Sequence, residues 1–221
     1  QTQVDRVIPK FKSFIKKFPS IRVLAEAPLM EVLVAWQGLG YNRRGKLLQD
    51  AAKKILSDHT GRVPLTRIDL EKLPAIGHYT AGAIRAFAFN EPDDFLETNI
   101  RTVLIHEFFP KAKKVEDSKL LKMLPELRGK VSPRIFYSAM MDYGAYLKKQ
   151  GIKLNFKSKH YTKQKPFKGS DREVRGAILR SLAENRSLVS LTFSKPRVRK
   201  ALAGLLKEGL ISKGKSGYGL P

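Results

Sequence analysis

Cysteine is absent from the 221-residue sequence. Its absence excludes disulfide bonds, thiolate nucleophiles, and zinc or iron–sulfur centres that depend on cysteine ligands. Histidine is scarce as well, and its residues are scattered without the spacing of a metal site: His59, His78, His106 and His160. The sequence therefore predicts no metal site and no other cofactor.

Long apolar runs are also missing. A membrane-spanning helix needs roughly 18 consecutive apolar residues, and no such stretch is present. No signal-peptide pattern is found either. We therefore expect no membrane-spanning segment and no membrane partner.

Acidic residues are few in comparison with basic ones. Lysine and arginine number 43 against 20 acids, which gives a formal net charge of +23. An excess of this size predicts a polyanionic partner. Membrane surfaces attract basic proteins too, but no single basic amphipathic helix carries the excess. The composition therefore favours nucleic acid.

The first two thirds of the chain show helical periodicity. Apolar residues recur at intervals of three and four, which is typical of amphipathic helices, and strand-like alternation is nearly missing. The predicted helices are Val4–Phe18, Leu29–Trp36, Gly45–Leu56, Asp69–Leu73, Thr80–Phe89, Thr98–Phe108, Ser118–Leu127 and Pro133–Leu147. The fold class is therefore predicted to be mainly α.

The composition changes near Gly151. Eight lysines and no acid lie between Lys148 and Lys168, which predicts an exposed linker over residues 148–169. Two roles are open to its aromatic residues, because such rings stack on bases or dock against a folded domain. These residues are Phe156, Tyr161 and Phe167.

Residues 170–221 resemble a small winged helix-turn-helix domain. Helices are predicted over Asp171–Glu184 and Lys195–Glu208, followed by two short strands with a Gly/Ser/Lys turn. Basic residues of the second helix and of the wing are candidate DNA contacts: Arg197, Arg199, Lys200, Lys213 and Lys215. Winged helices also dock proteins, and charge alone does not decide between the two roles.

The stretch Leu73–Gly82, with the sequence LPAIGHYTAG, predicts a helix-hairpin-helix. Two helices joined by a turn that needs Gly77 present backbone N–H groups at the start of the second helix, where they favour a phosphate oxygen. The candidate contacts are Ala75, Gly77, His78, Tyr79 and Thr80. Taken alone, the pattern favours an ordinary helix turn with a glycine cap.

Other blocks make this hairpin more specific. In order they are Gln1–Val4, Trp36–Tyr41, Leu73–Gly82, Leu96–Leu104 and Ala139–Ala145. Together they resemble the helix-hairpin-helix DNA glycosylases that excise a mismatched base, most closely the MutY-type adenine glycosylases. The resemblance covers residues 1–147 and implies a glycosylase domain there, incomplete at its N-terminus.

The resemblance assigns roles at the lesion. Leu39 and Tyr41 would fill the gap left when the target nucleotide leaves the stack, and Gln1 would contact the orphaned base. Arg43, just after this loop, is counted among the DNA contacts. The simpler alternatives are a core leucine, a packed tyrosine and a frayed terminus.

The catalytic position departs from the family. Glu97 falls where relatives have an aspartate that stabilises the oxocarbenium-like sugar. One extra methylene changes its reach, and a misplacement of about 1 Å can cost roughly 100-fold in rate. Alternatively, Glu97 is only an acid favoured by a helix start.

The resemblance places the acid that protonates the leaving base five residues before Gln1. We therefore expect the chain to begin inside a longer gene product, and to bind DNA but excise poorly as it stands. Tyr79 occupies the position where bifunctional relatives have a Schiff-base lysine, so a monofunctional enzyme is implied. The four cluster cysteines of the family and its usual domain for checking 8-oxoguanine are not recognisable here.

The resemblance implies a base-excision repair glycosylase that flips a base in duplex DNA and hydrolyses its N-glycosidic bond. The substrate is predicted to be adenine opposite 8-oxoguanine or guanine, and the protein a monomer in a prokaryotic cytoplasm, associated with the nucleoid. Thymine or uracil excision opposite guanine is an alternative, because tyrosine at position 79 also suits thymine glycosylases. A non-catalytic lesion-binding protein, and a transcription regulator led by the winged helix, are the others.

Overall fold

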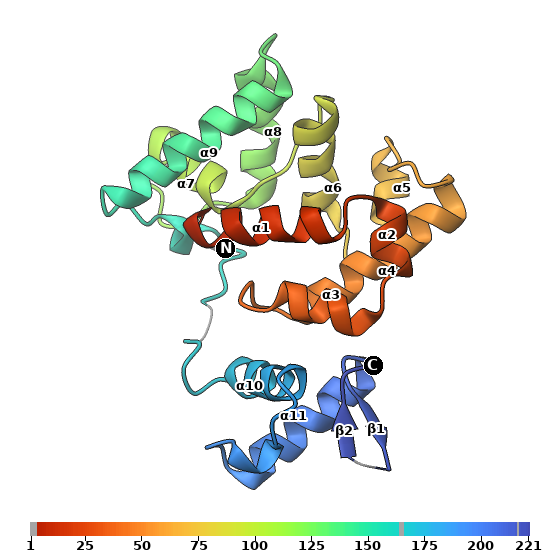
Figure 1. Ribbon diagram of the computed structural model, residues 1–221. Helices are drawn as coiled ribbons and strands as arrows, with labels where there is room; N and C mark the ends of the chain where they lie inside the picture. The colour runs from red at the N-terminus through yellow and green to blue at the C-terminus, as the bar shows by residue number, and fades with distance from the viewer. Residues whose placement is uncertain (1–3, 164–165, 216) are drawn as a thin grey trace. The chain divides into compact units, whose positions relative to one another are not determined.

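The structure is a computed structural model that describes residues 4–163, 166–215 and 217–221 (Figure 1). Its helices are α1 (Val4–Lys17), α2 (Ile21–Glu26), α3 (Leu29–Trp36), α4 (Arg43–His59), α5 (Arg67–Glu71), α6 (His78–Ile84), α7 (Thr98–Phe108), α8 (Asp117–Arg128), α9 (Pro133–Lys149), α10 (Asp171–Ala183) and α11 (Lys195–Lys207). A π-helical turn, η1 (Arg85–Phe89), continues α6, and two short 3-10 turns are η2 (Asn155–Lys157) and η3 (Leu188–Ser190). The strands are β1 (Ser212–Gly214) and β2 (Gly217–Gly219). The mainly α prediction is confirmed.

The chain forms two compact units. The first unit comprises Gln1–Val63, Leu73–Ala75 and Lys165–Pro221, and the second comprises Pro64–Lys72 and Ile76–Gln164. These units differ from the domains predicted from composition and resemblance, which were residues 1–147, 148–169 and 170–221. The latter remains a prediction about domains.

The first unit has two apolar clusters that share α3. On one side of this helix, Val32 packs with residues such as Phe18 and Leu24. On the other side, Leu33 packs with Val174 and Ile178 of α10 and with residues of α11, all of them buried. The C-terminal helices are therefore anchored on α3.

The end of the chain returns to the same helix. The backbone N–H of Met30 donates to the carbonyl of Pro221 at 3.2 Å. Just before it, β1 and β2 pair as an antiparallel hairpin, with Ser212 opposite Gly219 and Lys213 opposite Tyr218. Two helices followed by a β-hairpin match the elements predicted for a winged helix.

The second unit is built around α7. Ile100, Leu104 and Ile105 of this helix are fully buried and pack with Leu120 of α8 and Tyr137 of α9. Their spacing of one, four and five residues places them on a single side of the helix. Within the described ranges, no helix combines the length and the apolar character needed to cross a membrane.

The predicted exposed linker is partly folded into the second unit. The backbone of Val115 exchanges hydrogen bonds with Lys157 and Lys159 at 2.8 and 3.0 Å, and Asn155 Nδ2 donates to Thr102 Oγ1 at 2.9 Å. The prediction of a fully exposed linker is therefore wrong for this part, because lysine content reports solvated side chains and not the hydrogen bonds of the backbone. The rings of the aromatic residues in this segment stay about half exposed: Phe156, Tyr161 and Phe167.

Asp117 joins this segment to α7. Its carboxylate accepts two hydrogen bonds from the Arg101 guanidinium, at 3.1 and 2.7 Å, and one from Ser158 Oγ at 2.8 Å. Burial alone would raise the pKa of Asp117, but the hydrogen bonds from Arg101 and Ser158 outweigh it and hold this pKa below its usual range. The interaction therefore stabilises the fold while Asp117 is ionised.

We expect Asp117→Asn to lower the free energy of unfolding by about 1–3 kcal/mol at pH 7, because it leaves Arg101 without its charged partner. A lowered folded-state pKa contributes stability above the unfolded-state pKa, near 3.8, that is lost as the pH falls through the folded-state value. The gap between wild type and variant should therefore close in strong acid. Urea titrations followed by circular dichroism at pH 7 and at acidic pH measure it. Glu26→Gln, which removes an exposed ion pair with Arg22, is the control; a gap independent of pH would contradict the prediction.

Candidate active site and nucleic-acid interface

The predicted hairpin is formed by α5, a six-residue turn and α6. Thr66 begins α5, since its Oγ1 accepts a hydrogen bond from Asp69 N at 3.1 Å. In the turn, Ala75 has a left-handed φ of 61°, whereas Gly77 is extended with φ −99° and ψ 179°. The left-handed residue of the turn is therefore Ala75.

This geometry corrects the prediction that the turn needs Gly77. A Cβ added at Gly77 would meet nothing within 4 Å, and its φ is open to any residue. An alanine in the left-handed region is disfavoured because its Cβ crowds the following carbonyl. Residue type alone did not show which of the two positions carries the unusual dihedral.

The predicted phosphate contacts surround the start of α6. Gly77 is the N-cap residue and supplies no side-chain cap. Of the other predicted contacts, Ala75, His78 and Tyr79 are exposed, with Tyr79 at 47%. Thr80 is half-buried. The first amides of α6 therefore lie among exposed side chains.

Arg67, which sequence reasoning missed, ties the hairpin to the segment before α7. From α5 its guanidinium donates to the His78 carbonyl at 3.0 Å, to the Asp94 carbonyl at 3.0 Å, and to Asp93 Oδ2 at 3.1 Å. Arg85 of η1 reaches the same Asp93 oxygen at 2.8 Å. One carboxylate thus receives two arginines from the two helical parts of the hairpin.

Gly82 gives this network its space. A Cβ at this position would lie 2.9 Å from the Arg67 guanidinium and 3.0 Å from Phe95 Cβ. Phe95 is buried, and its ring packs between Tyr79 and Tyr137, with centroids at 5.8 and 4.2 Å. The exposed Tyr79 therefore rests on the segment that leads to Glu97.

Tyr137 fixes that segment from α9. Its hydroxyl donates to Asp94 Oδ1 at 3.1 Å. Burial, together with the Asp94 charge, raises the pKa of Tyr137. No motif marked this residue, because it lies 43 positions from its partner.

Glu97 is the N-cap residue of α7. Its Oε1 accepts hydrogen bonds from the amides of Asn99 and Ile100, the latter at 3.3 Å, and Oε2 takes part in neither. The capping role that we considered as an alternative is therefore present, and it leaves one carboxylate oxygen outside the cap. A Cβ on Gly144 would come within 2.5 Å of Asn99, so α9 approaches the start of α7 at backbone distance.

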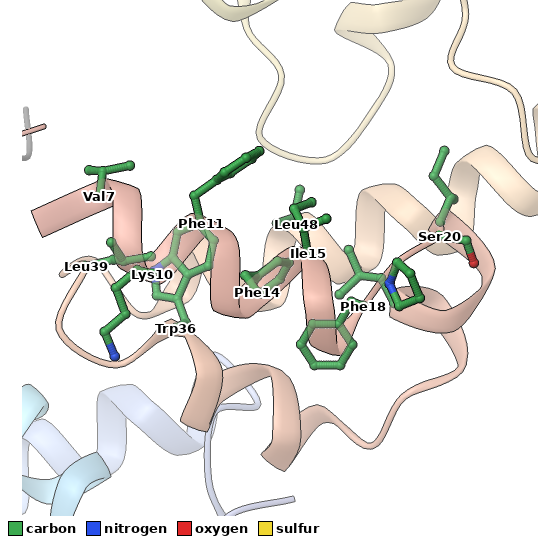
Figure 2. A pocket seen from close by; sticks show the side chains of 13 residues that line it. Val7, Lys10, Phe11, Phe14, Ile15, Phe18, Ser20, Trp36, Leu39 and Leu48 are labelled. Carbon is green, nitrogen blue, oxygen red and sulfur yellow. The ribbon is translucent and has the colours of Figure 1, made fainter. Parts of the chain in front are cut away.

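The predicted wedge loop lies in the first unit. Gly38, Gly40 and Tyr41 have left-handed φ values of 87°, 77° and 48°. Trp36 Nε1 donates to the Gly40 carbonyl at 3.0 Å and closes the loop onto the end of α3. Leu39 lines an open apolar pocket of about 540 Å³ beside α1. Figure 2 shows the Leu39 side chain next to that helix.

The remaining predicted contacts of this unit differ in their surroundings. Arg43 is exposed at the start of α4, and Gln1 lies outside the described residues. Arg197 faces inward: its guanidinium donates to the carbonyls of Gly169 and Ser170 at 2.9 and 3.1 Å. Arg197 therefore hydrogen-bonds the residues that immediately precede α10.

The other basic residues predicted to contact DNA in residues 170–221 are exposed. Arg199 and Lys215 are exposed, and Lys200 forms an exposed ion pair with Asp171 at 3.1 Å. The ammonium of Lys213 lies 5.9 Å from the Tyr218 ring centroid. Elsewhere, the described residues hold no cluster of three or more histidine, aspartate or glutamate side chains suited to a metal.

Solved structures share this architecture. A thermostable thymine-DNA glycosylase matches with a TM-score of 0.56 at 22% identity, covering 65% of this chain and 68% of that one. An endonuclease III in a trapped DNA complex matches with a TM-score of 0.57 at 23% identity and the same coverage. The fold is thus that of the helix-hairpin-helix glycosylases.

The family model described as HhH-GPD superfamily base excision DNA repair protein matches residues 1–183, and the chain belongs to this family. Adenine DNA glycosylases are among its relatives. The protein of Buchnera aphidicola subsp. Baizongia pistaciae is 37% identical over 66% of this chain and 42% of its own length, and that of Mycolicibacterium smegmatis is 30% identical over 96% and 80%. The human protein is 41% identical over 47% of this chain and 19% of its own.

The resemblance to MutY-type enzymes is thereby confirmed. The chain spans less than half the length of the Buchnera and human relatives. The alignment with the Mycolicibacterium protein, in contrast, includes nearly all of this chain.

The left-handed Ala75 makes a simple stability prediction. Ala75→Gly should raise the free energy of unfolding by roughly 0.5–1 kcal/mol, because glycine adopts this φ without the Cβ clash. The shift of the thermal midpoint measures it. Gly77→Ala is the matched control, expected to be close to neutral because the unfolded-chain entropy that alanine removes is offset by the preference of a helix N-cap for glycine over alanine. A lower midpoint for Ala75→Gly would count against the assigned turn.

Proposed function

We propose that the protein is a monofunctional DNA glycosylase that removes adenine opposite 8-oxoguanine or guanine. The observation that carries the proposal is Glu97, a carboxylate held by the first amides of α7 with one oxygen outside the cap. The family match and the adenine glycosylase relatives support the reaction class and the base. Tyr79 in place of an amine supports hydrolysis without a Schiff base.

In the proposed reaction the bond between the sugar C1′ and the adenine nitrogen breaks, water supplies the new hydroxyl at C1′, and the leaving adenine nitrogen gains the proton that balances the water consumed. Positive charge develops on the sugar before water arrives. A fixed carboxylate stabilises that charge without having to reorient, which is the main way in which enzymes lower such barriers. The ion pairs of Asp93 and the close approach at Gly144 supply the rigidity that this role of Glu97 needs.

Duplex DNA containing the mismatched or damaged base is the proposed partner, bound by a monomer. Backbone amides at the start of α6 would hold a phosphate, and Leu39 and Tyr41 would enter the base stack. A cytoplasmic, nucleoid-associated role in a prokaryote belongs to the same proposal; bacterial proteins, from Buchnera and Mycolicibacterium, are among the relatives. DNA contacts by Arg199 and the wing lysines are also part of it, since these side chains are exposed.

The chemical role of Glu97 is tested by Glu97→Gln in the intact protein. The amide oxygen of glutamine still accepts from the α7 amides, so the cap is kept while the negative charge is lost. We expect single-turnover excision of adenine opposite 8-oxoguanine to slow by about 100-fold or more, with DNA affinity unchanged. Glu97→Asp, which keeps both charge and cap, should retain excision.

Two results would contradict this role. Unchanged excision by Glu97→Gln would leave Glu97 as a helix cap only. An intact parent that binds mismatched DNA without excising any base would favour the non-catalytic lesion-binding protein. Excision of thymine or uracil opposite guanine in preference to adenine would move the proposal to the other substrate class.

Phosphate contacts are tested by salt dependence. Lys153 and Lys163 are exposed, whereas the ammonium of Lys157 donates to the Pro110 carbonyl at 2.8 Å. Each phosphate contact contributes about 0.9 to the slope of log K against log salt. We expect a steep slope that becomes shallower in Lys153→Gln/Lys163→Gln and is unchanged in Lys157→Gln. Fluorescence anisotropy with duplex DNA measures it, and a wild-type slope near zero would contradict phosphate-dominated binding.

A further inference from the structure

Tyr41 in the wedge loop is contacted by a residue 131 positions away, Arg172 in the first turn of α10. The Arg172 guanidinium carbon lies 5.7 Å from the centroid of the Tyr41 ring. The same guanidinium donates a hydrogen bond to the Tyr41 hydroxyl at 3.3 Å. A cation beside the ring and a donor at its far end restrict both the tilt and the direction of the side chain.

The helix that carries Arg172 is firmly placed within the first unit. Val174 and Ile178 on its buried side pack against Leu33 of α3. An ion pair at 2.6 Å joins Arg175 to Glu208, which follows α11. Because α3 runs directly into the wedge loop, the loop and the helix that contacts its tip share one support.

The loop depends on such outside contacts. Tyr41 is a non-glycine residue with a φ of 48°, a conformation disfavoured by its Cβ. Residues persist there where the surroundings over-determine them, often at functional positions. Tyr41 is also 43% exposed, so one side of it is held while the rest is open to a partner.

We propose that Arg172 is a positioning residue for the wedge, which holds the Tyr41 ring in the orientation that enters the DNA base stack. The C-terminal helices then serve as a support for lesion recognition, whether or not they also contact DNA themselves. This inference rests on the proposed function, because it takes Tyr41 to act during base flipping. It adds a residue outside the motifs that carried the resemblance.

The test compares Arg172→Ala with Arg180→Ala, which removes the same charge from an exposed position on the same helix. Binding to a duplex with 2-aminopurine opposite 8-oxoguanine is followed by the fluorescence rise that accompanies unstacking. We expect Arg172→Ala to slow that rise roughly 2- to 5-fold, the range that an exposed cation–π contact implies. Arg180→Ala should match wild type, and the thermal midpoint of Arg172→Ala should fall by no more than about 2–4 °C, the loss expected for one exposed contact.

A double-variant cycle with Tyr41→Leu shows whether Arg172 acts through Tyr41. Leucine keeps an apolar wedge but offers no ring and no hydroxyl, so adding Arg172→Ala should slow unstacking no further. Additive slowing would overturn the inference by showing that Arg172 acts on DNA directly. A normal fluorescence rise in Arg172→Ala would overturn it while leaving the proposed function intact, whereas no rise in wild type would overturn both.

Discussion

The shared ion pairing of Asp93 is the constraint on which the second unit depends. Its carboxylate, 13% exposed, joins Arg67 of α5 to Arg85 of η1, which continues α6. An ion pair with so little solvent is costly to break, because the charge that remains has lost its water and its partner. The two helical parts of the hairpin are therefore held to one point in the chain, four residues before Glu97.

Aromatic packing extends this constraint in both directions. Phe95 lies between Tyr137 of α9 and the exposed Tyr79 of α6, so the surface of the hairpin and the buried core meet at one ring. Glu97 is then placed by the α7 amides and by the close approach of α9 at Gly144. A candidate catalytic carboxylate needs such a frame, because a charge that must move to meet the reacting sugar stabilises it less.

Some of the basic side chains are hydrogen-bonded within the protein and are not simply exposed charges. Lys157 and Lys159 of the lysine-rich segment hold the Pro110 carbonyl and the Glu116 carboxylate, and Arg197 holds two carbonyls before α10. The hydrogen bond and the charge of Lys159 lower the pKa of Glu116. Some basic residues thus stabilise the fold, and others are exposed to a binding partner. The sequence gives only their total charge.

Local patterns were enough for the family and for most helices, although α2 (Ile21–Glu26) was not predicted and α5 begins and ends two residues earlier than predicted. Helices can be predicted because the spacing of apolar residues follows the helical period. The family can be predicted because its motifs occur in the same order along the sequence. Local patterns did not predict the left-handed Ala75 or the folded part of the linker. They also did not predict the contact of Arg67 with Asp93 or that of Arg172 with Tyr41. The last two join residues 26 and 131 positions apart. The sequence by itself determined a mainly α protein of the base-excision family, and only the tertiary structure decided which charges meet, because partners in a packed fold are selected by proximity in space.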